Sequence, residues 1–147
     1  MDIPKKENPY INILLWTLLI ILAVFIFSKK MYGQSKEEVY KELMKQEVQH
    51  PEIVMAQILY ETRHLKSNIC KVNHNLFGMK LPHQRQTTAI GEDSNTFAIY
   101  RNWKESITDY LIWQTKYYKG GDYYQFIKDS GYCPSEDYVP TLKRIKI

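Results

Sequence analysis

The feature that most constrains this chain is an uninterrupted apolar stretch near its N-terminus. Residues 11–27 read INILLWTLLIILAVFIF, and no charged side chain occurs between residues 8 and 28. A helix rises about 1.5 Å per residue, so about 20 residues cross the roughly 30 Å hydrocarbon core of a bilayer. The sequence therefore predicts one transmembrane helix, which contacts lipid through residues 10–28 and precedes a separate domain.

A cleaved signal peptide is the alternative interpretation of this stretch. The apolar region of a signal peptide usually spans about 7–15 residues and ends in small residues at the cleavage site. Here the run is longer and is followed by Ser28, Lys29 and Lys30, without such an exit. We therefore expect residues 1–30 to form an uncleaved signal anchor. Lysines flank the stretch on both sides, so the positive-inside rule gives no orientation.

Composition limits the partners of the remaining residues. The 147-residue chain carries 20 Lys and Arg against 16 Asp and Glu, a net charge of +4. This excess is too small to indicate nucleic-acid binding. A hydrophobic share of 44% excludes a disordered, solvating chain. Residues 31–147 are long enough for one domain of ordinary size.

Periodic patterns predict a mainly α-helical domain with a short β-hairpin wing. Residues 35–38 have the form of a capping box, which starts a helix that is expected to end near residue 49. Pro51 suits the first position of a second helix, which is expected to run into residues 61–64. Further helices are predicted over residues 103–118, over residues 122–131 and from residue 137 onward.

Two β-prone runs between these helices are separated by turn-forming residues. Residues 87–90 and 96–100 are rich in Thr, Ile and aromatic side chains, whereas residues 91–95 read GEDSN. This order predicts a hairpin with its turn at residues 91–95. Residues 68–83 show no sustained period, and we expect no helix or strand there.

Two Glu-x-x-His pairs raise the question of a metal site. Glu47 with His50, and Glu61 with His64, have the spacing found in di-iron helix bundles. Such bundles need four long helices, and Pro51 ends the first pair at a helix boundary. Coincidence is the better explanation, and we expect neither a metal nor another cofactor.

The pairing of the two cysteines stays open. Cys70 and Cys133 lie in no recognisable nucleophile context, and two cysteines are too few for a Cys-based zinc site. They are either two small buried side chains or a disulfide. The disulfide becomes plausible if the domain lies outside the cytoplasmic membrane.

One pair of motifs is far more specific than the rest of the sequence. AQILYET at residues 56–62 is followed by NLFGMK at residues 75–80. This order resembles the glucosaminidase family of peptidoglycan hydrolases (glycoside hydrolase family 73), whose motifs read Ala-Gln-x-x-x-Glu-Ser and Asn-Leu-Phe-Gly-Ile-Lys. Residues 97–100 and 131–138 resemble later motifs of the same family, so the resemblance runs over nearly the whole domain.

The resemblance implies a lysozyme-like fold that hydrolyses the glycan of peptidoglycan at N-acetylglucosaminyl bonds. It implies Glu61 as the general acid and Tyr132 as a further catalytic residue. It places the second acid in the hairpin turn, at Glu92 or Asp93. The substrate-binding residues that it implies are Asn75, Phe77, Gly78, Tyr100 and Tyr138.

The residues around Glu61 support this role independently. A glycosidic oxygen leaves poorly unless it is protonated, so the enzyme needs a carboxylic acid that keeps its proton near neutral pH. Burial against apolar neighbours raises a carboxyl pKa because it disfavours the anion. Glu61 follows Ile58 and Leu59 at the end of a mostly apolar helix, where such burial is expected. The alternative is a solvated Glu paired with Arg63 or His64.

The sequence also departs from the family pattern. The Gly that usually follows the family's Glu by four residues is Leu65 here, and Ala-x-Asp-Pro is replaced by residues 133–136, CPSE. The wing is short, and a substrate-assisted route, in which the sugar's own acetamide attacks, would need no second carboxylate. Trp103 and Trp113 are expected in the core rather than as platforms for sugar rings.

Two alternatives to a hydrolase stay open. The same fold acting as a lytic transglycosylase needs one carboxylate, and a module without catalysis would bind glycan or a partner protein. Peptidoglycan lies outside the cytoplasmic membrane, so for the hydrolase we expect a single-pass protein of the bacterial cytoplasmic membrane. Its catalytic domain, residues 31–147, would face the periplasm or cell wall. The expected partners are glycan strands and lipid, and cell-envelope or phage-lysis proteins would fit the same location.

Overall fold

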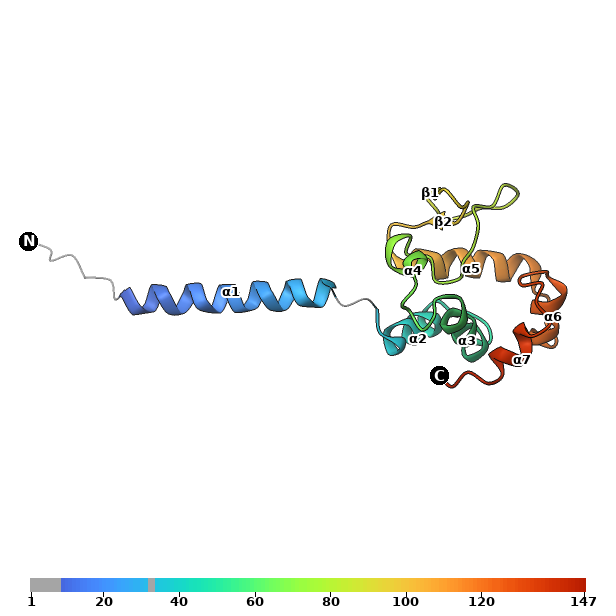
Figure 1. Cartoon of the computed structure of the whole chain (residues 1–147), viewed down its shortest axis with the longest axis horizontal. Coiled ribbons are helices and arrows are strands. Elements are labelled where there is room, and N and C mark those ends of the chain that lie inside the picture. The colour runs from blue at the N-terminus through green and yellow to red at the C-terminus, as the bar shows by residue number, and fades with distance from the viewer. Residues whose placement is uncertain (1–8, 32–33) are drawn as a thin grey trace, which may run out of the picture. The chain divides into compact units, whose positions relative to one another are not determined.

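The computed structural model describes the backbone of residues 9–31 and 34–147. Within the first of these segments, side-chain exposure is described for residues 12–24. The chain divides into two compact units, residues 1–33 and residues 34–147. We consider each unit by itself (Figure 1).

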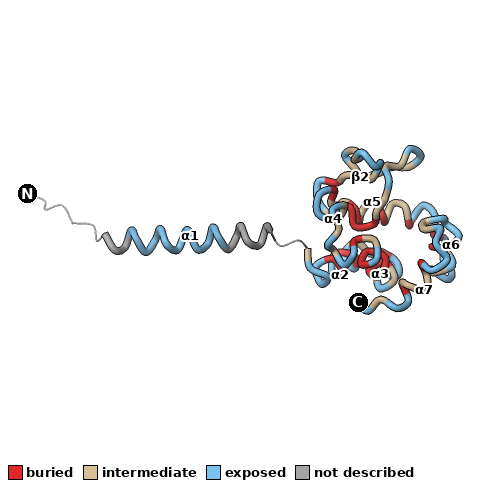
Figure 2. The backbone as a smooth tube through the Cα atoms, in the orientation of Figure 1, coloured by how far each residue is buried: buried red, intermediate tan, exposed pale blue. Residues whose placement is uncertain are grey.

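The described residues of the first unit form one helix, α1 (Pro9–Met31). Its large apolar side chains between residues 12 and 24 are exposed, and Trp16 is 67% accessible, as Figure 2 shows for this part of α1. The predicted helix is thus confirmed. In the parts of the chain that the structure describes, no helix meets both the length and the hydropathy needed to cross a membrane. The membrane span stays a prediction.

The second unit is mainly helical and carries one small antiparallel sheet, as predicted. Its helices are α2 (Lys36–Lys45), α3 (Pro51–Glu61), α4 (Asn68–Val72), α5 (Trp103–Tyr117), α6 (Tyr123–Asp129) and α7 (Tyr138–Leu142). The two strands, β1 (Gly91–Glu92) and β2 (Ala98–Ile99), pair with each other. Helix α3 packs against both α2 and α7, α5 packs against α2, and α6 packs against α7 (Figure 1).

Side-chain caps start several helices where the sequence predicts them. Ser35 and Glu38 form the predicted capping box of α2. Asn102 caps α5 through two backbone N–H groups, and Asp122 caps α6 in the same way. Pro51 lies in the first turn of α3, where its missing N–H costs nothing. The predicted starts of these four helices are confirmed.

The connection between α2 and α3 begins earlier than predicted, because α2 ends at Lys45. Glu47 and His50 adopt left-handed backbone conformations, with φ of 57° and 54°. The Nε2 atom of His50 lies 2.8 Å from the Tyr118 hydroxyl, and its ring stacks on Tyr123. These contacts hold the turn that returns the chain into α3.

The end of α3 also comes earlier than predicted, at Glu61. Arg63, His64 and Leu65 have φ of 49°, 57° and 66°. A left-handed residue other than Gly costs about 1–2 kcal/mol, so three in succession form a strained turn directly after Glu61. The Oγ1 atom of Thr62 stabilises this turn, because it accepts a hydrogen bond of 2.8 Å from the Leu65 N–H.

The predicted hairpin is present, but its strands are displaced along the chain. Residues 87–90 do not form a strand, and Gly91–Glu92, which the sequence places in the turn, is β1. Asp93 is the physical reason for this difference. Its Oδ1 accepts hydrogen bonds from the N–H groups of Asn95 and Phe97, at 2.9 and 3.0 Å. These bonds close a turn over residues 93–97, two positions later than the sequence predicts.

The prediction of no element over residues 68–83 is wrong, since Asn68–Val72 form α4. Ser67 caps this helix, which is too short to give a recognisable period. Cys70 is buried within it, whereas Cys133 is partly exposed, and both thiols are free. Of the two alternatives for the cysteines, the structure therefore shows unpaired side chains.

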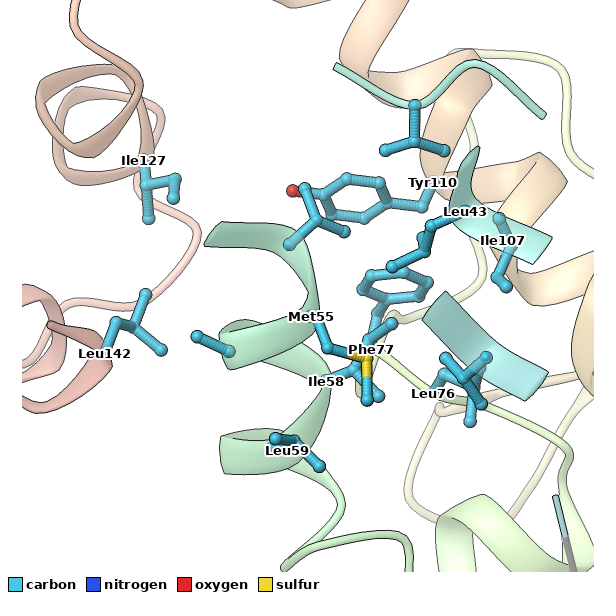
Figure 3. Packing of buried hydrophobic residues seen from close by; sticks show 14 of the residues in the cluster. Leu43, Met55, Ile58, Leu59, Leu76, Phe77, Ile107, Tyr110, Ile127 and Leu142 are labelled. Atoms are coloured by element: carbon cyan, nitrogen blue, oxygen red, sulfur yellow. The ribbon is translucent and has the colours of Figure 1, made fainter. Parts of the chain in front are cut away.

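The core fixes the motif loop against α3. Phe77 comes from the loop between α4 and β1, and its ring stacks on Tyr110 of α5 with 4.1 Å between ring centroids. Figure 3 shows this pair beside Met55 and Ile58 of α3. All four side chains are at most 2% exposed. This packing holds the loop that carries residues 75–80 beside the end of α3.

Candidate active site

A cleft of about 360 Å³ lies at the C-terminal end of α3. It combines Glu61, residues 77–80 and Arg85 from the segment before β1, Trp113 from α5, and Tyr132 from the loop before α7. These parts of the chain are distant in sequence. The fold therefore brings Glu61 together with two of the later motifs, as the resemblance implies.

Glu61 is held in this cleft by a single tyrosine. Its Oε1 accepts a hydrogen bond of 2.8 Å from the Tyr138 hydroxyl. Burial raises the pKa of Glu61 above its usual value, and the hydrogen bond from Tyr138 offsets part of this rise. Burial is the larger effect. The carboxyl group therefore keeps its proton to higher pH than an exposed Glu does, which is what a general acid requires.

The other carboxyl oxygen of Glu61 faces Gly78. A Cβ atom at position 78 would lie 3.4 Å from Oε2, and the φ of Gly78 is +61°. A side chain here would contact the oxygen and would occupy a backbone region that favours glycine. The glycine of the motif thus leaves the cleft open in front of Oε2.

Asn75, which the resemblance implies in substrate binding, has a structural place. It is fully buried. Its Nδ2 donates to the carbonyls of Met79 and Ala98 at 2.8 and 3.0 Å. Its Oδ1 accepts from the N–H groups of Phe77 and Met79 at 3.2 and 3.1 Å. These four bonds use the capacity of the amide, so Asn75 shapes the loop that presents Phe77 and Gly78.

The three predicted tyrosines have different places. Tyr132 lines the cleft, and its hydroxyl donates to the Phe77 carbonyl at 2.7 Å. Tyr138 is buried behind the carboxyl group of the cleft. Tyr100 is also buried and donates to Oδ2 of Asp109 at 2.8 Å, and it does not line the cleft. Burial raises the pKa of all three hydroxyls, so each remains a donor at neutral pH.

The predicted second acid does not line the cleft. Glu92 is exposed on β1. Asp93 accepts a hydrogen bond of 2.7 Å from Asn73, and this bond, with those of its own turn, lowers the pKa of Asp93. Among the described residues that line the cleft, Glu61 is the only carboxylic acid.

The two Glu-x-x-His pairs make separate local contacts. His50 contacts Tyr118 and Tyr123, whereas Glu61 contacts Tyr138. Over residues 9–31 and 34–147, no three His, Cys, Asp or Glu side chains are grouped so that they could hold a metal ion.

Two residues of the cleft, Arg85 and Trp113, lie outside the motifs that the sequence analysis identifies. Arg85 donates to both carboxyl oxygens of Asp109, at 2.6 and 3.0 Å, and neither side chain is more than 6% exposed. No motif surrounds Arg85, so the sequence carries no signal for this pair. Trp113, expected in the core, does pack against the core but also lines the cleft.

A second pocket of about 760 Å³ adjoins the cleft, since Arg85 and Trp113 line both. The rings of Trp113, Tyr117 and Phe126 form its aromatic wall. Aromatic walls with a few polar groups are typical of sites for small organic ligands. The polar residues of this pocket include His83, Gln84, Asp129 and Ser130.

Comparison with known proteins agrees with this geometry. The sequence model of the Glucosaminidase family, described as mannosyl-glycoprotein endo-beta-N-acetylglucosaminidase, matches residues 37–146. The chain belongs to the glucosaminidase family. Membership makes it a glycosidase of the peptidoglycan-hydrolase class, and the predicted resemblance is confirmed. A comparison with curated proteins found no match.

A solved structure shares the fold of this glucosaminidase. One chain of a type VI secretion system effector–immunity complex from Pseudomonas protegens matches it with a TM-score of 0.50 and 15% sequence identity. The match covers 63% of this chain and 75% of that chain. At this identity the likeness concerns the fold alone. The helices and the small sheet are consistent with the predicted lysozyme-like architecture.

Proposed function

We propose that this glucosaminidase cleaves the glycan strands of bacterial peptidoglycan at N-acetylglucosaminyl bonds, with Glu61 as the general acid. The supporting observation is the environment of that carboxyl group. Burial raises its pKa, and its Oε2 borders the open cleft at Gly78. A protonated carboxyl in this position can protonate the glycosidic oxygen while the bond to the sugar carbon breaks.

The adjoining pocket offers the glycan a path away from Glu61. The apolar face of a sugar ring packs on aromatic side chains, while its hydroxyls need polar partners. Trp113 lies between the cleft and the pocket, whose wall continues with Tyr117 and Phe126. A strand bound at Glu61 would pass over Trp113. Trp113→Ala is therefore expected to raise KM, and Trp103, which lines neither cavity, provides the matched control Trp103→Ala.

A lytic transglycosylase is the second candidate, and one observation favours it. Glu61 is the only carboxylic acid among the described residues that line the cleft, so a second carboxylate to activate water has no candidate there. Two routes need one carboxyl group only. In the first, the acetamide of the sugar attacks and water then completes hydrolysis. In the second, a hydroxyl of the sugar attacks and an anhydro sugar forms.

Digestion of purified peptidoglycan by the full chain, purified in a mild detergent, separates these reactions by mass spectrometry of the products. Reducing N-acetylglucosamine ends indicate the hydrolase, and anhydro-muramic ends indicate the transglycosylase. Glu61→Gln should lower the rate about 10²–10⁴-fold because an amide supplies no proton. Glu52→Gln, in the first turn of the same helix, is the matched control and should stay active.

Unchanged digestion by Glu61→Gln would overturn the proposal. Glu92→Gln tests the second acid directly. If it loses as much activity as Glu61→Gln, a two-carboxylate mechanism holds and Glu92 reaches the substrate. If it stays active, the one-carboxyl routes gain support.

The proposal includes a membrane anchor at residues 1–30, which would place the catalytic domain on the outer side of the cytoplasmic membrane, beside its substrate. The sequence has no charged residue between positions 8 and 28. The helix α1 extends over Pro9–Met31, and about 20 residues suffice to cross a bilayer. Side-chain exposure is described for residues 12–24 of α1. For the remaining residues of the anchor, the support is the sequence itself.

Membrane fractionation tests the anchor. Leu18→Lys combined with Leu22→Lys should release the chain from the membrane fraction, since each central Lys costs about 2.5–3.5 kcal/mol. The control places two lysines at exposed apolar positions of the second unit, Val72 and Ile147, and should leave the chain in the membrane. Added protease should digest the catalytic domain of intact spheroplasts. If the catalytic domain is protected from the protease, it faces the cytoplasm and the proposed orientation is wrong.

A further inference from the structure

Arg85 is a buried arginine at the border of the two cavities, and the proposed reaction gives it no role so far. It lines both the cleft at Glu61 and the aromatic pocket beside it. Its side chain is 6% exposed, although residues 81–90, which carry it, form neither a helix nor a strand. A charged side chain is almost never buried to this extent unless a partner holds it. Here that partner is Asp109.

Three hydrogen bonds fix the position of the Arg85 guanidinium. Its Nη1 donates to Oδ1 of Asp109 at 2.6 Å and to the Gln86 carbonyl at 2.8 Å, and its Nη2 donates to Oδ2 of Asp109 at 3.0 Å. Asp109 is fully buried on α5, and its Oδ2 also accepts from the Tyr100 hydroxyl at 2.8 Å. A planar guanidinium in such a bidentate pair has little freedom to turn. Its remaining N–H groups therefore have set directions.

These bonds leave part of the donor capacity of Arg85 unused. An arginine side chain has five N–H donors, and the three bonds occupy one of them each. To the described residues, Nε makes no hydrogen bond. It is not buried either, since the buried side-chain nitrogen or oxygen without a partner in that part of the chain is Nε2 of Gln57. Because Arg85 lines the two cavities, a ligand bound there can reach the Nε–H.

The charges of this pair select the kind of acceptor that suits the Nε–H. The guanidinium and the Asp109 carboxylate neutralise each other, so an anionic ligand would add an uncompensated charge at a largely buried site. A cationic ligand would meet a donor rather than an acceptor. A neutral carbonyl oxygen accepts the hydrogen bond and adds no charge. The sugars of peptidoglycan carry such an oxygen in their acetamide groups, and N-acetylglucosamine has no other amide.

We propose that Arg85 determines specificity for N-acetylated glycan: its Nε–H donates to the acetamide carbonyl of a sugar bound in the cleft. The inference rests on the proposed function, since it needs a glycan strand at Glu61. Lys80 also lines the cleft, but it is exposed and its ammonium approaches the Phe97 ring, 6.0 Å from the centroid. Arg85 offers a donor whose direction the protein sets before the substrate binds, which is how a polar group in a ligand site gives specificity.

Three preparations of one peptidoglycan test the proposal with the full chain in detergent. One is untreated, one is enzymatically N-deacetylated, and one is stripped of its stem peptides by an amidase. The variant is Arg85→Met combined with Asp109→Asn, because removing both charges leaves no buried charge unpaired. Loss of a hydrogen bond from a charged donor should lower kcat/KM on untreated material about 10–100-fold, mainly through KM. Stem-stripped material should show the same loss.

The ratio of rates on untreated and N-deacetylated material separates specificity from a merely structural role. The double variant should lose this ratio, whereas a distorted cleft would slow both reactions alike. Lys116→Met is the matched control. The Lys116 Nζ donates to the Gln84 carbonyl at 3.0 Å, so it ties the same segment to α5, but it lines neither cavity. An unchanged ratio in the double variant, a lost ratio in Lys116→Met, or a loss that disappears on stem-stripped instead of N-deacetylated material would each contradict the proposal.

NMR of the Arg85 Nε–H group, with ¹⁵N labelling, keeps the test independent of turnover and of the folding of the double variant. The full chain carries Glu61→Gln, so that the ligand is not consumed. A tetramer of N-acetylglucosamine should shift the Nε–H resonance, and a tetramer of glucosamine at the same concentration should not. If the original chain digests peptidoglycan but the resonance stays in place, the proposed function stands and the role of Arg85 is wrong. If the resonance shifts with the N-acetylated tetramer alone and nothing is digested, glycan binding through Arg85 stands and the proposed cleavage is wrong.

Discussion

A glutamate lies at each end of α3 and accepts a hydrogen bond from a tyrosine, but the pKa values of the two carboxyl groups shift in opposite directions. Glu52 lies in the first turn and accepts a hydrogen bond of 2.8 Å from the Tyr40 hydroxyl. Glu61 is the last residue and accepts one of 2.8 Å from Tyr138. The pKa of Glu52 is lowered, first by a backbone N–H and then by Tyr40. The pKa of Glu61 is raised, because burial outweighs its tyrosine.

The surroundings of these two carboxyl groups, rather than their tyrosine partners, decide the direction in which each pKa shifts. Glu52 is exposed, and the free N–H groups at the start of a helix favour an anion. Glu61 is partly buried at the opposite end, where the helix dipole disfavours an anion. Arg85 lines the same cleft, but its guanidinium forms an ion pair with Asp109. Glu61 thus combines burial with a neighbouring arginine that is already paired.

The largest effect is expected when the charge of Arg85 is released from its pair with Asp109. Asp109→Asn leaves the Arg85 guanidinium, which is 6% exposed, without its anion. Removing one partner of a buried ion pair costs about 3–5 kcal/mol, to be measured by denaturant unfolding. The released charge should stabilise the Glu61 anion and move the alkaline limb of the activity profile to lower pH.

The double variant Asp109→Asn with Arg85→Met is the control for that experiment. It removes both charges, so it should recover part of the lost stability and return the limb toward its original pH. A limb that stays in place in Asp109→Asn would mean that the Arg85 charge does not reach Glu61.

The next effect in size compares the two tyrosines. Tyr138→Phe should lower kcat about tenfold, because the Glu61 carboxyl loses the bond that orients it. The same change removes a bond that stabilises the anion, so the alkaline limb should move to higher pH. Tyr40→Phe deletes a bond of equal length at Glu52 and should leave both kcat and the limb unchanged. Similar profiles for the two variants would contradict the assignment of Glu61.

The pH dependence of stability should have opposite signs at the two ends of α3. Glu61 has a raised pKa in the folded chain, so its contribution to stability is present below the unfolded value of about 4.3 and is lost as pH rises through the folded pKa. Glu52 has a lowered pKa, so its contribution is present above about 4.3 and is lost as pH falls. Unfolding of Glu61→Gln and Glu52→Gln, each against the original chain between pH 3 and 8, measures both slopes. Slopes of equal sign would contradict the comparison.

The parts of this arrangement that the sequence predicts are those with local signals. The acidic role of Glu61 is suggested by apolar neighbours within one helical turn and by the motif at residues 75–80. Capping residues such as Ser35 and Asn102 place helix starts, because a cap acts on N–H groups two or three residues away.

The parts that the sequence does not predict depend on distant contacts. The Arg85–Asp109 pair joins residues 24 positions apart and carries no motif. The helical period places Trp113 on the buried face of its helix, but it does not show whether part of the ring remains exposed. Its exposure at the cleft depends on how neighbouring segments pack around it. The hairpin is displaced because the Asp93 side chain, rather than the composition of the run, closes the turn.

A second contrast between the two ends of α3 concerns the backbone. Directly before α3, His50 alone has a left-handed backbone conformation. After α3, Thr62 is followed by three left-handed residues in succession. Functional sites commonly retain such strain when the surrounding structure holds it in place. The turn after Glu61 is therefore a place where stability and function can be separated.

The smallest predicted effect is a gain at His64, which is exposed and has a φ of 57°. His64→Gly removes the Cβ that makes this conformation costly, by about 1–2 kcal/mol, while the greater freedom of glycine in the unfolded chain offsets part of that gain. A net stabilisation of about 0.5–1 kcal/mol should appear in denaturant unfolding. His64→Ala keeps the Cβ and should show no such gain. Equal stabilities of the two variants would mean that the turn is not strained, and a loss of activity in His64→Gly alone would mean that the stiffness of this turn helps to hold Glu61 in the cleft.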